Sequence, residues 1–127
     1  MQKNESQPAP CLYFNTRDEL TRINLNDVAY FEADGNYTHI MLSNGCKATI
    51  LISLSAIEHL IDNELKGQVK PFIRIGKSYI VNSSFIFQIN VLKQKLVLTN
   101  VVSSHVFTLN ISKEALKNLK DLYTQKK

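Results

Sequence analysis

Glycine, proline and cysteine are scarce in this chain, and tryptophan is absent. Its 127 residues include 4 Gly, 3 Pro and 2 Cys, together with 44% hydrophobic and 20% charged residues. This balance is typical of a soluble globular protein and argues against a disordered, low-complexity chain. The length fits one ordinary domain with a single core, so one domain has to carry the function.

Signals for export or membrane insertion are also missing. The opening "MQKNESQPAP" is polar throughout and lacks the apolar stretch of a secretory signal. The apolar stretches "ATILISLSAI" and "YIVNSSFIFQI" are interrupted by polar residues and fall short of the roughly 18 residues of a membrane helix. We therefore expect a cytoplasmic protein, in which residues 1–10 form a flexible tail and residues 11–125 form the folded domain.

Residues that could support catalysis or bind a metal are few and scattered. Cys11 and Cys46 fit neither CxxC nor zinc-ligand spacing, so we interpret them as buried free thiols. His39, His59 and His105 have no partner at ligand spacing, which favours core or surface histidines over metal ligands. The chain has no phosphate-cradling glycine loop and no nucleophile elbow. We expect no metal, no cofactor, no small-molecule substrate and no catalysis.

Basic and acidic residues are distributed unevenly along the chain. Residues 1–65 hold 4 Lys and Arg against 9 Asp and Glu, a net charge of −5, whereas residues 66–127 hold 11 against 2, a net charge of +9. A domain polarised in this way often presents its basic side to nucleic acid or another anionic surface, although a run of charge is more often only a solvated face. The charge pattern alone leaves both interpretations open.

From Cys11 onwards, short segments rich in Ile, Val, Phe, Tyr and Thr alternate with turn residues, a pattern typical of β-strands. "CLYFNTRDELTRINL" predicts a hairpin that turns at residues 16–19. In "DVAYFEADGNYTHIMLSNGCKATIL" we expect three antiparallel strands joined at residues 34–36 and at Asn44-Gly45, because both positions of an Asn-Gly pair accept positive φ. Further strands are expected in "FIRIG", "SYIVN", "FIFQIN", "KLVLT" and "HVFTLNI".

Two segments change to the period of a helix. In "SLSAIEHLIDNEL" apolar residues recur at helical spacing, and Ser55 with Glu58 fits a capping box at the start of a helix. An apolar stripe near the end of the chain predicts a second helix. Its members are Ile111, Ala115, Leu116, Leu119, Leu122 and Tyr123. The sequence therefore predicts a mainly β domain with one short internal helix and a C-terminal helix.

The order of these segments resembles that of one known family, the LytTR DNA-binding domain of bacterial response regulators. "INLNDVAYFEADGNYTHIML" is similar to its strand-loop-strand segment and "SLSAIEHL" to its short helix. "PFIRIGKSYIVNSSFIFQI" resembles its most distinctive stretch, and "FTLNISKEALKNL" its closing strand and helix. The resemblance runs from about Cys11 to Tyr123, and its specificity comes from four segments in the right order.

This resemblance implies a fold of about ten short, mostly antiparallel strands in small packed sheets, and it implies double-stranded DNA as the partner. Loops, not a recognition helix, would enter the major groove. The DNA would be bent, two copies would occupy neighbouring promoter repeats as a homodimer, and a separate signalling protein could control the regulator. The residues implied in DNA binding are Asn36, Tyr37, Thr38, Lys77, Ser78, Ser112 and Lys113, with Lys93 and Lys95 along phosphates.

The residue types suit these roles, although each has a plainer interpretation. A Lys or Asn on a loop can reach base acceptors in the major groove, while phosphate contacts fix register. Asn36 could instead supply only a turn conformation, and Tyr37 could pack on its sheet. Arg74 alternates with apolar neighbours, so either a phosphate contact or a simple surface charge fits it. We interpret Asn82 as a cap or turn residue before Ser83-Ser84.

Two departures from the family bear on function. The family usually carries His-Arg where this chain has Gly76-Lys77, and an ammonium recognises guanine less well than a forked guanidinium does. The usual N-terminal receiver domain has no counterpart before Cys11, which predicts a stand-alone regulator or an excised fragment. The alternative function is a non-catalytic protein-interaction module that sequesters a LytTR-type regulator or its partner, and a small enzyme is the least favoured.

Overall fold

Ten short strands and two α-helices make up the domain. The structure is a computed structural model that describes residues 8–124, so residues 1–7 of the expected tail and residue 125 lie outside it. The strands are β1 (Cys11–Asn15), β2 (Leu20–Asn24), β3 (Val28–Asp34), β4 (Tyr37–Leu42), β5 (Lys47–Ile50), β6 (Phe72–Ile75), β7 (Tyr79–Asn82), β8 (Ile86–Asn90), β9 (Lys95–Thr99) and β10 (Val106–Asn110). The helices are α1 (Leu54–Glu64) and α2 (Lys113–Thr124). The predicted fold class is confirmed.

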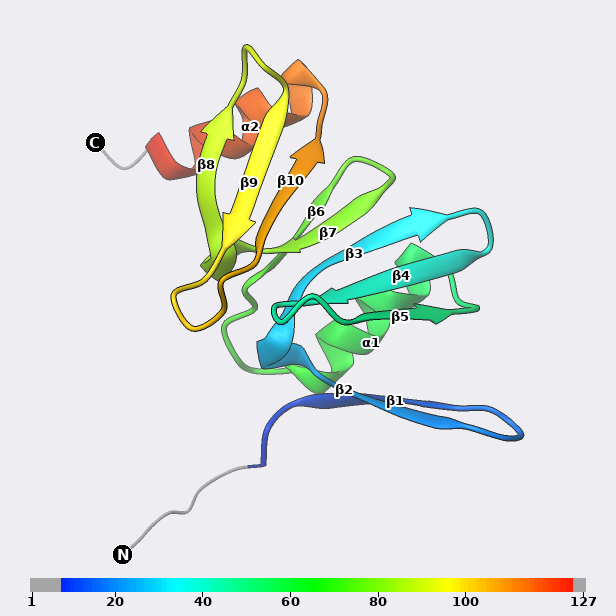
Figure 1. Cartoon of the computed structure of the whole chain (residues 1–127). Helices are drawn as coiled ribbons and strands as arrows, with labels where there is room; N and C mark the ends of the chain where they lie inside the picture. Colours follow the sequence, from blue (N-terminus) through cyan, green and yellow to red (C-terminus); the bar gives the residue numbers. More distant parts are fainter. Residues whose placement is uncertain (1–7, 125–127) are drawn as a thin grey trace, which may run out of the picture.

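The strands form three antiparallel sheets (Figure 1). β1 and β2 form a hairpin, β10, β9 and β8 form a three-stranded sheet, and the largest sheet has the order β5-β4-β3-β7-β6. The predicted hairpin turn at residues 16–19 is confirmed by the hydrogen bond from Thr16 N–H to the Glu19 carbonyl, 2.8 Å. The predicted turn at Asn44-Gly45 is also present, but only Gly45 takes positive φ there.

One hydrophobic core lies between the largest sheet, the β1–β2 hairpin and α1. Ser53 caps α1 by accepting a hydrogen bond from Ala56 N–H, so the helix begins two residues before the predicted capping box at Ser55. The buried face of α1 contributes Leu54, Ile57 and Ile61 to this core. Successive side chains of a strand point to opposite sides of the sheet, so only every second one faces α1. Phe31 of β3 is one of the residues that pack against the helix in this core.

A second core lies between the other face of the sheet, the β8–β10 sheet and α2. Leu116 and Leu119 of α2 are buried in it, whereas Leu122 and Tyr123 of the predicted stripe are about half exposed, at 53% and 51%. Tyr30 of β3 joins the two sheets by packing edge-on against Phe107 of β10, with ring centroids 5.8 Å apart.

Two asparagines end strands in the same way. Asn24 and Asn82 each precede a short 3₁₀ helix, at Leu25–Asp27 and Ser83–Phe85, and the side-chain oxygen of each accepts the N–H two residues on. Asn82 is 3% exposed and also donates from Nδ2 to the Val28 carbonyl, 2.9 Å away. The interpretation of Asn82 as a cap residue is confirmed, and its side chain in addition connects β7 to the start of β3.

The β4–β5 turn contacts the β9–β10 loop at the left of Figure 1. Ser103 Oγ donates to the Ser43 carbonyl at 2.6 Å, and the His105 ring lies against the α-carbon of Gly45. Cys46 follows in the same turn and is exposed, so the prediction of a buried thiol is wrong for Cys46 and right for Cys11. The turn protrudes from the sheet, which leaves its side chains outside both cores.

Candidate nucleic-acid interface

The β3–β4 turn presents two of the predicted DNA-binding residues. Asp34 pairs with Tyr37, so only Gly35 and Asn36 connect the strands, and Gly35 supplies the positive φ of 60° that this tight turn needs. Asn36 and Tyr37 are exposed, the latter at 48%. Because Gly35 takes the positive φ of the turn, Asn36 is not needed for that conformation.

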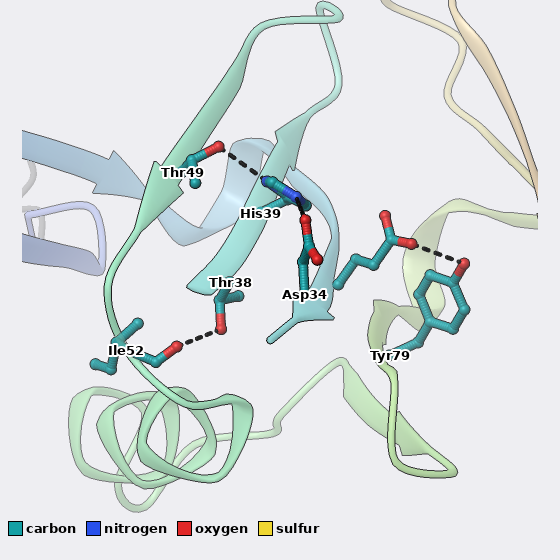
Figure 2. A network of polar contacts seen from close by, with 7 residues as sticks. Asp34, Thr38, His39, Thr49, Ile52 and Tyr79 are labelled. Atoms are coloured by element: carbon teal, nitrogen blue, oxygen red, sulfur yellow. Dashed lines mark hydrogen bonds and ion pairs between the residues drawn. The ribbon is translucent and has the colours of Figure 1, made fainter. Parts of the chain in front are cut away.

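Thr38 does not belong to the exposed surface of this turn. It is 0% exposed, and its hydroxyl donates to the Ile52 carbonyl at 2.8 Å (Figure 2). The expectation of a direct DNA contact from Thr38 is corrected by this burial. Its position two residues before Ile40, on the same face of β4, was the signal in the sequence that could have indicated an inward side chain.

The β6–β7 turn consists of Gly76, Lys77 and Ser78, and all three residues are exposed. The Ser78 carbonyl accepts a hydrogen bond from Ala33 N–H at 2.8 Å, which fixes this turn beside the end of β3. Lys77 has no carboxylate partner among residues 8–124. The ammonium group is therefore available to an anion or to base acceptors.

Arg74 was expected to be a phosphate contact or a simple surface charge, but its guanidinium is already paired within the domain. Its Nη1 forms an ion pair with Glu58 Oε1 of α1 at 3.0 Å, and its Nε donates to the Gly76 carbonyl at 3.1 Å. The side chain is 28% exposed and lies on the α1 side of the sheet. Arg74 thus holds the first residue of the β6–β7 turn.

The start of α2 lies next to this turn. Ser112 Oγ accepts a hydrogen bond from Ala115 N–H, which caps the helix, and Lys113 follows it on the surface. Ser112 and Asn110 line one hollow of about 220 Å³ together with Lys77 and Ser78. The structure therefore brings together two segments that the sequence separates by more than thirty residues.

The two predicted phosphate contacts of the β8–β9 turn differ in accessibility. Lys93 is exposed, and no carboxylate of residues 8–124 pairs with it. Lys95 is partly buried, and its Nζ donates to Asn110 Oδ1 on the neighbouring strand. In Figure 1 the β3–β4 and β6–β7 turns point to the right, and the β8–β9 turn and the start of α2 lie above them.

A row of polar side chains runs across the largest sheet beneath these turns. Thr49, His39, Glu32 and Tyr79 face one another in register on β5, β4, β3 and β7, and we call them the polar row. His39 Nδ1 lies 2.8 Å from Thr49 Oγ1, and Tyr79 donates to Glu32 at 3.3 Å. His39 Nε2 also lies 2.8 Å from Asp34 Oδ2 (Figure 2). The row lies on the face opposite α1, at the edge of the second core.

Comparison with known proteins identifies the family. A family model described as the LytTr DNA-binding domain matches residues 18–124, which is most of the chain. The chain belongs to the LytTR family of DNA-binding domains. A solved LytTr DNA-binding domain of a response regulator from Bacillus cereus has the same fold, with a TM-score of 0.61 and 20% sequence identity over 91% of this chain and 98% of that one. No curated protein matches the sequence.

Membership of the LytTR family makes DNA the partner of this domain and a role in DNA-binding regulation its general function. No helix among residues 8–124 has both the length and the apolar character needed to cross a membrane. In the same part of the chain, no group of three or more His, Cys, Asp or Glu side chains is arranged to hold a metal ion.

The polar row is the part of this LytTR domain that sequence reasoning missed. His39 was interpreted as an isolated histidine because its contacts depend on pairing across β3, β4 and β5. The spacing of Glu32, Asp34 and His39 around the 34–36 turn could have indicated that these side chains meet, since a tight hairpin places His39 directly across from Glu32 and diagonally across from Asp34.

Two tyrosines near the LytTR turns hold their protons tightly. Burial, followed by the Glu32 charge, raises the pKa of Tyr30. Burial, then the charge and the hydrogen bond of Glu32, raises the pKa of Tyr79 to about 12. Since this pKa is raised above the unfolded value, its contribution to stability is complete below pH about 10 and is lost as pH rises towards about 12.

We expect absorbance titration at 295 nm to locate Tyr79 among the last tyrosines to ionise. The Tyr79→Phe variant should lack the portion of the absorbance change closest to pH about 12, and Glu32→Gln should move that portion to lower pH because the carboxylate no longer opposes ionisation. Loss of a step near the ordinary tyrosine pKa in Tyr79→Phe would contradict the assignment.

Proposed function

We propose that this chain is a sequence-specific, double-stranded DNA-binding transcription regulator that reads the major groove with its turns. The observation that carries the proposal is the convergence of the β6–β7 turn and the start of α2 on one hollow, next to the exposed β3–β4 turn. A two-stranded hairpin is narrow enough to enter the major groove of B-DNA, which is about 12 Å wide. Turns can therefore perform the role that a recognition helix has in other DNA-binding domains.

The residue types favour a division of work between the turns. Asn36 and Lys77 lie at turn tips and can reach base edges. An Asn side chain can hydrogen-bond to the donor and acceptor of adenine, and a Lys side chain can donate to the acceptors of guanine. Lys93 and Lys113 lie at the margins of this surface, where cations would contact phosphates and fix register. The rest of the exposed surface consists of Tyr37, Ser78 and Ser112. Arg74 and Lys95 donate hydrogen bonds within the domain, to the Gly76 carbonyl and to Asn110 Oδ1.

Selection of binding sites from random duplexes tests the proposal directly. The selected duplex and a scrambled control are compared by fluorescence anisotropy at several salt concentrations. We expect a short enriched motif, bound about a thousandfold more tightly than the control. Absence of enrichment, with weak binding that disappears steeply as salt rises, would overturn sequence-specific recognition.

Lys77→Ala and Lys93→Ala should weaken binding in different ways. Loss of a base contact at Lys77 should reduce the free-energy difference between specific and nonspecific binding by about 1–3 kcal/mol. Loss of a phosphate contact at Lys93 should weaken all sequences by a similar factor and reduce the salt slope by about one ion. Anisotropy with both duplexes at four or more salt concentrations measures both quantities.

Lys47→Ala is the matched control for these two variants. Lys47 is exposed and is the first residue of β5, directly after the β4–β5 turn, and its removal also lowers the net charge by one. In Figure 1 the β4–β5 turn lies on the side opposite the β3–β4 and β6–β7 turns. It should change neither the specificity ratio nor the salt slope by a comparable amount. Equal effects of all three variants on every sequence would count against the division between base and phosphate contacts.

A second candidate is the protein-interaction module, favoured by one apolar surface. Phe87 and Val101 adjoin one groove and are 71% and 102% exposed, and Val102 next to them is 92% exposed. Phe87 lies on β8, and Val101 and Val102 lie in the β9–β10 loop, at the end of this sheet opposite the β8–β9 turn. A tight complex with a LytTR-type regulator, together with nonspecific DNA affinity only, would favour this candidate.

A further inference from the structure

His39 connects the β3–β4 turn to two strands at once. Its Nε2 lies 2.8 Å from Asp34 Oδ2, immediately before the turn, and its Nδ1 lies 2.8 Å from Thr49 Oγ1 on β5. Asp34 pairs directly with Tyr37, whose side chain is exposed at the turn. The orientation of the turn that carries Asn36 and Tyr37 therefore depends on a histidine that is itself on the neighbouring strand.

The same contacts accommodate both protonation states of the imidazole. When the ring is neutral, Nε2–H donates to Asp34 and Nδ1 accepts from the Thr49 hydroxyl. When the ring is protonated, both nitrogens donate, and the Thr49 hydroxyl needs only to rotate and accept. Histidine is the side chain whose charge changes between pH 5 and pH 8, so this change requires no backbone movement.

The charges around His39 give its proton a role in DNA affinity. The nearest titratable groups on its face of the sheet among residues 8–124 are Asp34, in contact, and Glu32, directly across on β3, beyond which lies Tyr79. Tyr37 lies two residues earlier on β4, Tyr30 lies diagonally across on β3, and Lys47 lies diagonally across on β5. Asp34 is 69% exposed and His39 20% exposed at their side chains. Two carboxylates near a surface for DNA oppose phosphates, and a protonated His39 offsets one of them.

We propose that His39 is a positioning residue for the β3–β4 turn and that DNA binding is linked to uptake of a proton by His39. This inference rests on the proposed function, because it concerns the same surface. Negative phosphates near the Asp34–His39 pair favour the protonated imidazole in the complex, so the complex binds protons more tightly than the free protein does. Affinity for DNA is then highest at low pH and falls as pH rises and the imidazole loses its proton.

The test measures the affinity of the full chain for its selected duplex between pH 6 and pH 8 at constant ionic strength. We expect the wild-type affinity to fall about fivefold to tenfold over this range. In His39→Gln, which keeps polar side-chain atoms but does not titrate, the fall should be absent. His59→Gln, at an exposed position on α1, removes a histidine elsewhere and should retain the wild-type pH profile.

Two further measurements distinguish structural damage by a substitution from a loss of the coupling between DNA binding and the proton on His39. Asp34→Asn keeps an acceptor for Nε2 and removes a charge, so it should raise the DNA affinity at pH 8 several-fold. Calorimetry in buffers of different ionisation enthalpy should show net proton uptake on binding near pH 7 by the wild type and none by His39→Gln. Thermal unfolding at each pH verifies that the variants are folded.

The outcomes separate this inference from the proposed function. A pH-dependent wild type with a flat His39→Gln profile and proton uptake supports the inference. Identical pH profiles for wild type and His39→Gln, with specific binding intact, overturn the inference and leave the proposed function standing. A lower affinity of Asp34→Asn at every pH also overturns it, and failure to select any duplex at pH 6 or pH 8 overturns both.

Discussion

Replacing Asn82 by alanine is expected to lower the free energy of unfolding by about 3 kcal/mol. The substitution leaves the buried Val28 carbonyl and the Ser84 N–H without their partner and creates a small cavity between β7 and β3. Buried backbone groups without hydrogen bonds are costly because water cannot replace the lost partner. Urea unfolding followed by circular dichroism measures this change.

Asn24→Ala provides the matched control for this prediction. Asn24 caps its 3₁₀ helix with the same side-chain hydrogen bond, but it is only partly buried, and within residues 8–124 its side chain makes no second hydrogen bond to a distant strand. It should cost about 1 kcal/mol, the usual value for loss of a capping side chain. If the two variants were destabilised equally, the hydrogen bond to Val28 would contribute little.

Gly45→Ala is expected to destabilise the domain by about 2–3 kcal/mol. Gly45 has φ of +91°, where a side chain is strained, and an added Cβ would lie 2.5 Å from His105 Nε2. The ring has little freedom to move away because it stacks on Phe107 and its Nδ1 contacts Ser103 Oγ. The same unfolding assay measures the loss.

A double-mutant cycle with His105→Ala separates strain from collision. In the His105→Ala background the collision is absent, so the added cost of Gly45→Ala should fall to the backbone strain alone, about 1–2 kcal/mol. An unchanged cost in that background would mean that the β4–β5 turn and the β9–β10 loop do not constrain each other.

Local turn chemistry made much of this fold predictable. The hairpins at residues 16–19, 34–36 and 44–45 follow from short-range signals, and each proved to connect neighbouring antiparallel strands. The placement of β7 beside β3 is different, because it depends on side chains that meet only after the chain has crossed α1. No periodicity within either strand encodes that neighbour, so the sheet order could not be predicted from the residues alone.

The candidate site was predictable where exposure follows from a turn and unpredictable where it depends on contacts. Lys77 and Asn36 are at tips and are exposed as expected. Thr38 is buried and Arg74 is bound to Glu58, because each side chain meets an element distant in sequence. DNA contacts by the exposed residues stay predictions until the variants are measured.

The two hydrophobic cores share one strand, and this has a consequence for the motions of the domain. Val28 and Phe31 of β3 belong to the core under α1, whereas Ala29 and Tyr30 belong to the core under α2. Because both cores use β3, opening either half would expose part of the other, and we expect the amide protons of β3 to exchange with solvent only when the whole domain unfolds. A ligand held at the turns would therefore slow deuterium uptake throughout both halves, well away from the residues that it touches.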